Sequence, residues 1–261
     1  MFCTAPGLGR RRLALAGSVS ALCGRIVRSS WPLPTGEPSL ELDALESHIG
    51  RELPVEAKAI LAVHNGQKST DTASRIEYAT PCLHTLSFLS TTLIQELWDF
   101  WNDLLDAPDA DELQDMGDVF PAAAGKVKPL YFSPGWIPLW SDPVRNDGIG
   151  LDLDPDRNGT YGQIINFGRD EKRHFLCAPD YTTLLHILLE EVLTGAWPAT
   201  EIASQSPDGT WTDLPWFGDP DDHFFNALYS RFEARQHSNA HSNKTDESGG
   251  SGPAENPTRF R

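Results

Sequence analysis

The order of apolar patterns between residues 86 and 195 constrains the fold more than any other feature of the sequence. Leu93, Leu97 and Trp101 recur at helical spacing, which predicts an amphipathic helix over residues 91–106. Four short runs of β type follow, and a helix that Asp180 caps and Gly195 ends completes the series. The runs cover residues 136–140, 148–153, 161–167 and 174–178, and the inward face of the last helix carries Leu184, Leu185, Leu188, Val192 and Leu193. Helices on both sides of a series of short strands predict an α+β domain.

Two more helices and a short strand are predicted before this series. The first helix begins at a Ser39 cap and ends at Gly50, and the second has Pro54 in its first turn and ends at Asn65-Gly66. Residues 86–89 read as a strand. The inward faces of the two helices carry Leu42, Leu45 and Ile49, and Ala57, Ile60 and Leu61, respectively.

Composition divides the chain into four parts. Residues 1–35 form a basic leader and a proline-rich linker that we expect to be poorly ordered, and residues 36–197 form the α+β domain. Residues 198–235 form an aromatic extension, whose second half is predicted to be a helix that packs back on the domain. Residues 236–261 are polar and predicted to be disordered. The leader fits a signal sequence, a transit peptide or a start codon assigned too early, and the sequence does not decide among them.

The net charge of −16 is unevenly distributed along the chain. Residues 1–30 carry +5 and no acid, so residues 31–261 carry −21. A body with this charge repels phosphate backbones, which argues against nucleic-acid binding and fits either a basic protein partner or a charge that serves solubility alone. No stretch approaches the roughly 20 apolar residues that a membrane span needs. The four cysteines are scattered without close spacing, which is typical of reduced thiols in a cytoplasmic protein.

Residues 96–118 contain nine acidic residues and neither lysine nor arginine. One interpretation is a solvated helix face followed by a mobile loop over residues 106–120. The other is an electrostatic landing surface that speeds the association of a cationic protein. The candidate partner-binding residues are Asp99, Asp103, Asp106, Asp109, Asp111 and Glu112.

Motifs that would indicate catalysis or metal binding fail on inspection. Asp154, Asp156 and Asn158-Gly159 match part of a calcium loop, but Ile165 stands where that loop needs a glutamate. The Asn158-Gly159 pair instead predicts a β-hairpin turn. The histidines lack metal-ligand spacing, and no nucleophile elbow or phosphate loop is present. We therefore expect no catalytic residue, no metal and no cofactor, and keep a hydrolase that uses carboxylates of residues 152–156 as a distant alternative.

Several segments, taken in order, resemble the SUKH superfamily over residues 36–195. These segments are residues 45–54, 60–67, 136–139, 150–155, 162–165 and 178–181. The family includes a fungal regulator of cell-wall glucan assembly and many bacterial immunity proteins. The motif residues that carry the resemblance, and that we expect to be mainly structural, are Glu46, Gly50, Leu53, Pro54, Asn65, Gly66, Trp136, Pro138, Asp152, Asp154, Gly162 and Gln163.

The resemblance implies a single α+β domain with a central, mainly antiparallel sheet flanked by helices, and it implies no enzymatic activity. Our first hypothesis is an immunity-type protein that neutralises a basic toxin, such as a nuclease, by direct binding. The alternative is a regulator of cell-wall glucan assembly that acts through protein partners. Either function places a protein, rather than a small molecule, as the partner.

Overall fold

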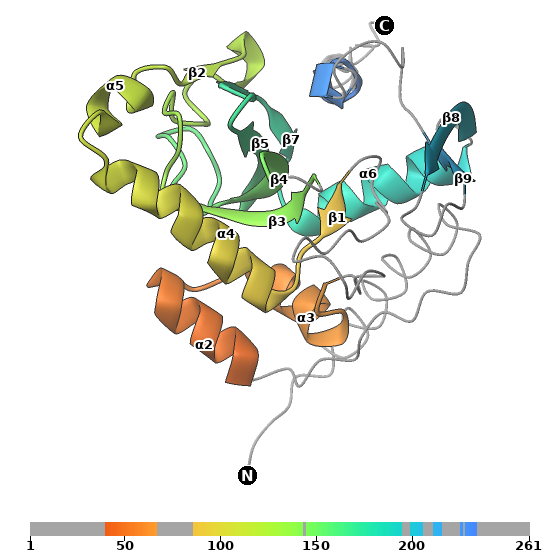
Figure 1. Ribbon diagram of the computed structural model, residues 1–261, viewed down its shortest axis with the longest axis horizontal. Coiled ribbons are helices and arrows are strands. Elements are labelled where there is room, and N and C mark those ends of the chain that lie inside the picture. The colour runs from red at the N-terminus through yellow and green to blue at the C-terminus, as the bar shows by residue number, and fades with distance from the viewer. Residues whose placement is uncertain are drawn as a thin grey trace, which may run out of the picture.

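The computed structural model describes residues 40–66, 86–142, 145–194, 199–205, 211–215, 225–226 and 228–233. Its centre is a five-stranded sheet in the order β1-β3-β4-β5-β7 (Figure 1), in which every neighbouring pair is antiparallel. The strands are β1 (Ser87–Phe88), β3 (Trp136–Ser141), β4 (Asp147–Asp152), β5 (Gln163–Gly168) and β7 (Leu176–Ala178). The α+β class and the mainly antiparallel sheet predicted from the sequence are confirmed.

The three central strands are enclosed on both faces. Every residue of β3, β4 and β5 is buried, although successive side chains point to opposite sides of a sheet. Helix α4 (Thr91–Asp103) packs on β3, and α6 (Tyr181–Leu193) packs on β5 and β7. Helix α2 (Leu40–Ile49) lies along α4 (Figure 1), while α3 (Val55–Val63) contacts both α2 and α6.

The helices before the sheet agree with the sequence patterns in most details. The faces of α2 and α3 predicted to point inward are buried, and Gly50 ends α2 with a φ of +66°, a backbone conformation that favours glycine. Pro54 lies at the N-cap of α3, one residue earlier than predicted. Ser39, the predicted cap of α2, lies outside the described residues.

The segment predicted as an acidic loop over residues 106–120 is partly regular, so that prediction was wrong. It contains a 3₁₀ turn η1 (Leu104–Asp106), helix α5 (Ala110–Gln114) and strand β2 (Asp118–Val119), and η2 (Pro121–Ala123) follows. Strand β2 pairs in parallel with β6 (Arg173–His174). The backbone N–H of Asp118 donates to the carbonyl of Lys172 at 2.8 Å. A partner more than fifty residues away leaves no local sequence pattern, which explains the error.

The run predicted as one strand over residues 174–178 is two strands, β6 and β7, which belong to different sheets. The backbone N–H of Phe175, between them, donates to the side chain of Asn166 in β5 at 2.7 Å instead of to a backbone carbonyl, which interrupts the ladder. The β-hairpin predicted around Asn158-Gly159 is present, since β4 and β5 are consecutive strands that pair antiparallel, but it does not close with a two-residue turn. A longer loop joins β4 to β5, because Asn158 N–H bonds to the Gly125 carbonyl at 2.8 Å and draws the loop sideways.

The last predicted helix is present as α6. Asp180 caps it by accepting a hydrogen bond from the Thr183 N–H at 2.7 Å. Leu184, Leu185 and Leu188 are buried as predicted, but Leu193 is 54% exposed. Eight residues beyond Leu185 the helix has turned roughly 80° past two full turns, so Leu193 points away from the core.

Beyond α6, strands β8 (Ala199–Gln205) and β9 (Trp211–Pro215) form a separate antiparallel pair that the sequence analysis did not predict. Residues 225–226 and 228–233 are helical, and Phe225, Leu228 and Phe232 are buried in the core. The proposed leader and tail lie outside the described residues, and the predicted domain limits stay a prediction. No helix among the residues described has the length and apolarity needed to cross a membrane.

Candidate functional site

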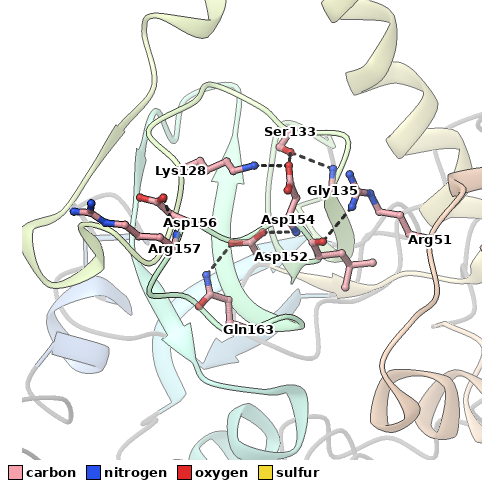
Figure 2. A network of polar contacts seen from close by, with 10 residues as sticks. Arg51, Lys128, Ser133, Gly135, Asp152, Asp154, Asp156, Arg157 and Gln163 are labelled. Carbon is pink, nitrogen blue, oxygen red and sulfur yellow. Dashed lines mark hydrogen bonds and ion pairs between the residues drawn. The ribbon is translucent and has the colours of Figure 1, made fainter.

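Several motif residues meet where β4 ends and the loop to β5 begins (Figure 2). Asp152 is fully buried, with 0% of its surface exposed. Its Oδ1 accepts a hydrogen bond from the Asp154 N–H at 3.0 Å, and its Oδ2 accepts one from Gln163 Nε2 at 2.8 Å. Gln163 also donates to the Lys126 carbonyl at 2.8 Å and accepts from the Thr160 N–H at 3.0 Å. Asp152 and Gln163 therefore hold both ends of the loop together.

Burial raises the pKa of Asp152 to about 6, while the hydrogen bonds from Gln163 and Asp154 act in the opposite direction. A carboxyl with a raised pKa is typical of a general acid. Here, however, the side chain is enclosed and each oxygen accepts a hydrogen bond from the protein itself. Its contacts therefore serve the ordering of the loop, and they leave no exposed oxygen for a substrate.

Asp154 points the other way and joins a second set of contacts. Lys128 Nζ lies 2.7 Å from its Oδ2, and Ser133 Oγ donates to the same oxygen at 3.4 Å. Ser133 Oγ in turn accepts the Gly135 N–H at 3.2 Å. A Cβ at Gly135 would lie 2.3 Å from the Cβ of Asp154, so only glycine fits there.

The remaining loop residues also bond to the protein. Arg51 Nη1 donates to the Leu153 carbonyl at 3.2 Å, and Asp156 Oδ1 accepts the Arg157 N–H at 2.8 Å (Figure 2). Ile165, at the position where a calcium loop needs its glutamate, is buried in β5. The described parts of the chain contain no group of three or more His, Cys, Asp or Glu side chains placed to hold a metal ion.

The opening motif packs against the far end of the same loop. Glu46 Oε1 accepts the Leu53 N–H at 2.6 Å and lies 3.0 Å from Lys58 Nζ. Gly162, with a φ of +82°, is pressed against Pro54, since a Cβ there would lie 2.6 Å from the proline Cγ. Residues more than one hundred positions apart are thus brought together, and Tyr161 reinforces the contact by donating to the Glu52 carbonyl at 2.6 Å.

The other motif residues have positions of their own. Asn65 Oδ1 accepts the Thr91 N–H at 2.7 Å and fixes the start of α4, where a Cβ at Gly66 would lie 2.3 Å from the Ser90 nitrogen. Trp136 pairs with Asp152 across β3 and β4, two residues before Pro138 in the same buried strand. All of these contacts are internal to the domain. They agree with a mainly structural role, which stays a prediction.

The acidic residues proposed to bind a partner lie along the end of α4, η1 and α5, and we call them the acidic surface. Asp99 is held by His48, whose Nε2 lies 2.5 Å from its Oδ1. The other five are exposed, and none of them forms an ion pair with another described residue. Phe100 and Met116, close by in the sequence, are 56% and 43% exposed. The acidic surface is Asp99, Asp103, Asp106, Asp109, Asp111 and Glu112.

Sequence reasoning missed a group of acids at the other end of β4. Burial, together with the nearby Asp147 and Asp170, raises the pKa of Glu171 to about 8. Burial also raises the pKa of Asp142. The pairing of Asp147 with Gly168 across β4 and β5 brings residues 142–147 to residues 170–171. No local spacing in the sequence predicts that these acids lie together.

Taken together, the structure defines an α+β domain whose polar motif residues organise loops and whose candidate partner-binding acids lie along the end of α4, η1 and α5. A sequence model of the SMI1 / KNR4 family (SUKH-1) matches residues 38–186. The chain belongs to this family, as its motif residues indicated.

Curated relatives are regulators of the cell wall by name. The chain is 30% identical over 174 residues to a cell wall biosynthesis and cell cycle regulator of Schizosaccharomyces pombe, covering 64% of this chain and 33% of the relative. It is 26% identical over 187 residues to a glucan synthesis regulatory protein of Neurospora crassa, covering 60% and 34%. A cell wall assembly regulator of Saccharomyces cerevisiae is 42% identical over 71 residues, or 27% and 14%. The match thus spans about a third or less of each relative.

Proposed function

We propose that this chain regulates the assembly of cell-wall glucan by binding protein partners and carries out no reaction of its own. The observation that carries the proposal is the family membership, because relatives in three fungi bear names of cell-wall or glucan regulators. The geometry supports a binding role. The polar motif residues that were candidates for chemistry, Asp152 above all, form hydrogen bonds within the domain itself.

The acidic surface supplies the place for a partner. Its five exposed carboxylates form no ion pair with another described residue, so a cationic partner meets charges that the domain does not neutralise. Phe100 adds exposed apolar area beside Asp99 and Asp103, and an aromatic ring flanked by charges is typical of a protein-binding surface. A charge of −21 on residues 31–261 makes nucleic acid an unfavourable ligand. We infer a basic protein partner and a cytoplasmic location.

The immunity hypothesis has weaker support. The acidic surface would also complement the basic cleft of a nuclease. That argument rests on charge alone, whereas relatives in Schizosaccharomyces pombe, Saccharomyces cerevisiae and Neurospora crassa are named as regulators. Regulation of glucan assembly is therefore the function we favour, and the enzyme remains the last alternative.

A chimera tests the proposal. The segment of the Schizosaccharomyces pombe regulator that matches this chain is replaced by the full chain, and the chimera is expressed in cells that lack the regulator. We expect the glucan content of the cell wall to return toward the level given by the intact regulator. A chimera that accumulates normally but leaves glucan at the level of the empty vector contradicts the proposal.

A further inference from the structure

Residues 225–226 and 228–233, which we call the cover segment, lie on the family domain although they fall outside the residues that the family model matches. Phe225, Leu228 and Phe232 are 2%, 1% and 3% exposed. Their spacing of three and four residues places them on one face of a helix, drawn in blue in Figure 1. The cover segment therefore uses a complete apolar face to contact the domain.

Aromatic side chains of the domain receive this face. The rings of Phe120 and Tyr229 are stacked, with centroids 3.7 Å apart and planes 18° apart. Phe175 lies within 6.4 Å, 5.6 Å and 6.1 Å of Phe225, Tyr229 and Phe232, measured between ring centroids. Phe120 and Phe175 belong to the family-matched region. We call the surface formed by Phe120, Phe175, Leu176 and Glu191 the aromatic groove.

One polar contact fixes the direction and register of the cover segment. Glu191 of α6 is 5% exposed, and its Oε2 accepts hydrogen bonds from Nε, at 2.8 Å, and Nη2 of Arg231. A buried carboxylate that receives two guanidinium nitrogens selects arginine over lysine, because lysine presents a single nitrogen. The aromatic groove thus recognises a helix that carries apolar residues at this spacing and one arginine between them.

The cover segment depends on the groove for its own order. Its described helical residues, 225–226 and 228–233, bury Phe225, Leu228 and Phe232 against the domain, so these contacts hold it in place. The fit is incomplete, since a hollow at the seam is lined by Ala123 and Leu176 of the domain and by Tyr229 and Phe232 of the cover segment. A segment outside the central sheet opens at a lower free energy cost than the sheet itself, which permits its exchange with an external helix.

We propose that the cover segment is an internal ligand, and that the aromatic groove beneath it is a docking site for an amphipathic helix of a partner protein. That helix carries aromatic or leucine residues at positions equivalent to Phe225, Leu228 and Phe232 and an arginine that reaches Glu191. Docking of the partner displaces the cover segment, so the chain limits its own binding. This inference rests on the proposed action through protein partners and names the surface and the chemistry of one of them.

A labelled peptide of residues 222–236 tests the exchange on the purified full chain. Tyr229→Ala and Arg231→Ala each weaken the internal copy, and we expect both variants to bind the peptide at least tenfold more tightly than the unaltered chain does. Ser230→Ala, an exposed change within the cover segment, should bind like the unaltered chain. Equal affinity for all four proteins, no binding by the two weakened variants, or their failure to fold would overturn the proposal, since each makes the segment a fixed part of the fold.

Hydrogen exchange of the unaltered chain gives an answer that needs no variant. Amides of the cover segment should exchange at least tenfold faster than those of β4 and β5, because the segment opens without unfolding the sheet. Exchange of both at the same rate would overturn the proposal. The peptide and exchange measurements do not involve glucan. The docking proposal can therefore be contradicted while the chimera restores glucan, and the chimera can leave glucan unrestored while the peptide binds as expected.

Discussion

Gln163 Nε2 donates a hydrogen bond of 2.8 Å to Oδ2 of Asp152, a carboxylate with no exposed surface. Gln163 begins β5 and Asp152 ends β4, so this bond closes the loop between them. A buried ionised carboxylate needs such donors, because burial without them is costly. Family resemblance singled out both residues, and the structure gives the physical relation between them.

Gln163→Leu removes this donor while keeping a side chain of similar length. We expect the free energy of unfolding to fall by about 2 kcal/mol at pH 8, because a buried charged acceptor loses its partner. The loss should be smaller at pH 4.5, below the Asp152 pKa of about 6, where the protonated carboxyl no longer needs that donor. Chemical denaturation at the two pH values measures both quantities.

Gln95→Leu is the matched control, because the Gln95 side chain forms a hydrogen bond with the exposed His48 and with no buried charge among the described residues. It should change the free energy of unfolding by less than about 0.5 kcal/mol at either pH. Two outcomes would contradict this prediction: equal losses of unfolding free energy for the two glutamine variants, or a loss for Gln163→Leu that is the same at both pH values. Either would show that the bond to Asp152 does not stabilise the fold more than an exposed hydrogen bond does.

Glu171 gives stability a pH dependence of a defined sign. Its pKa is about 8 in the folded protein against a usual 4.5, so the folded state holds a proton that the unfolded state has released between these values. Its stabilising contribution is complete below pH 4.5 and is lost as the pH rises toward 8. Glu171→Gln keeps an acceptor for Asn166 and cannot ionise, so it should escape this loss.

Unfolding of Glu171→Gln and the unaltered chain should be compared at pH 5 and pH 8. Between pH 5 and pH 8, we expect the free energy of unfolding of the variant to rise by roughly 3 kcal/mol relative to that of the unaltered chain. Glu112→Gln, on the exposed acidic surface, should gain nothing comparable. A difference between Glu171→Gln and the unaltered chain that stays constant with pH would mean that Glu171 is ionised normally in the folded protein.

Local sequence patterns correctly predicted the helices that have a regular apolar face or a capping side chain, and the strands that read as continuous apolar runs. The apolar stripe of α4, the Asp180 cap and the three central strands follow from spacing and capping rules. The resemblance to known sequences, rather than spacing, identified Asp152 and Gln163. What failed depends on distant backbone partners: β2 exists because β6 passes beside it, and the loop of the β4–β5 hairpin is longer than expected because Asn158 bonds to Gly125.

The sites that sequence reasoning missed have the same origin. Glu171 is an ordinary surface acid by sequence, and only the pairing of β4 with β5 places it near Asp147. Phe120 and Tyr229 are more than one hundred residues apart, and nothing in either neighbourhood predicts that their rings stack. Tertiary contacts between separated segments are therefore the part of this protein that its sequence patterns did not reveal.

The central claim is that the chain regulates glucan assembly through the acidic surface. Versions of the chimera in which three acids are replaced by uncharged amides test this claim most directly. One version carries Asp103→Asn, Asp106→Asn and Asp109→Asn, and the control neutralises as many charges with Asp43→Asn, Glu52→Gln and Glu56→Gln on or beside α2 and α3. Both should unfold at temperatures close to that of the unaltered chimera, since five of the six residues are exposed and Glu56 is half-buried. We predict that the control restores cell-wall glucan and the acidic-surface version does not. Equal restoration by both would contradict the account.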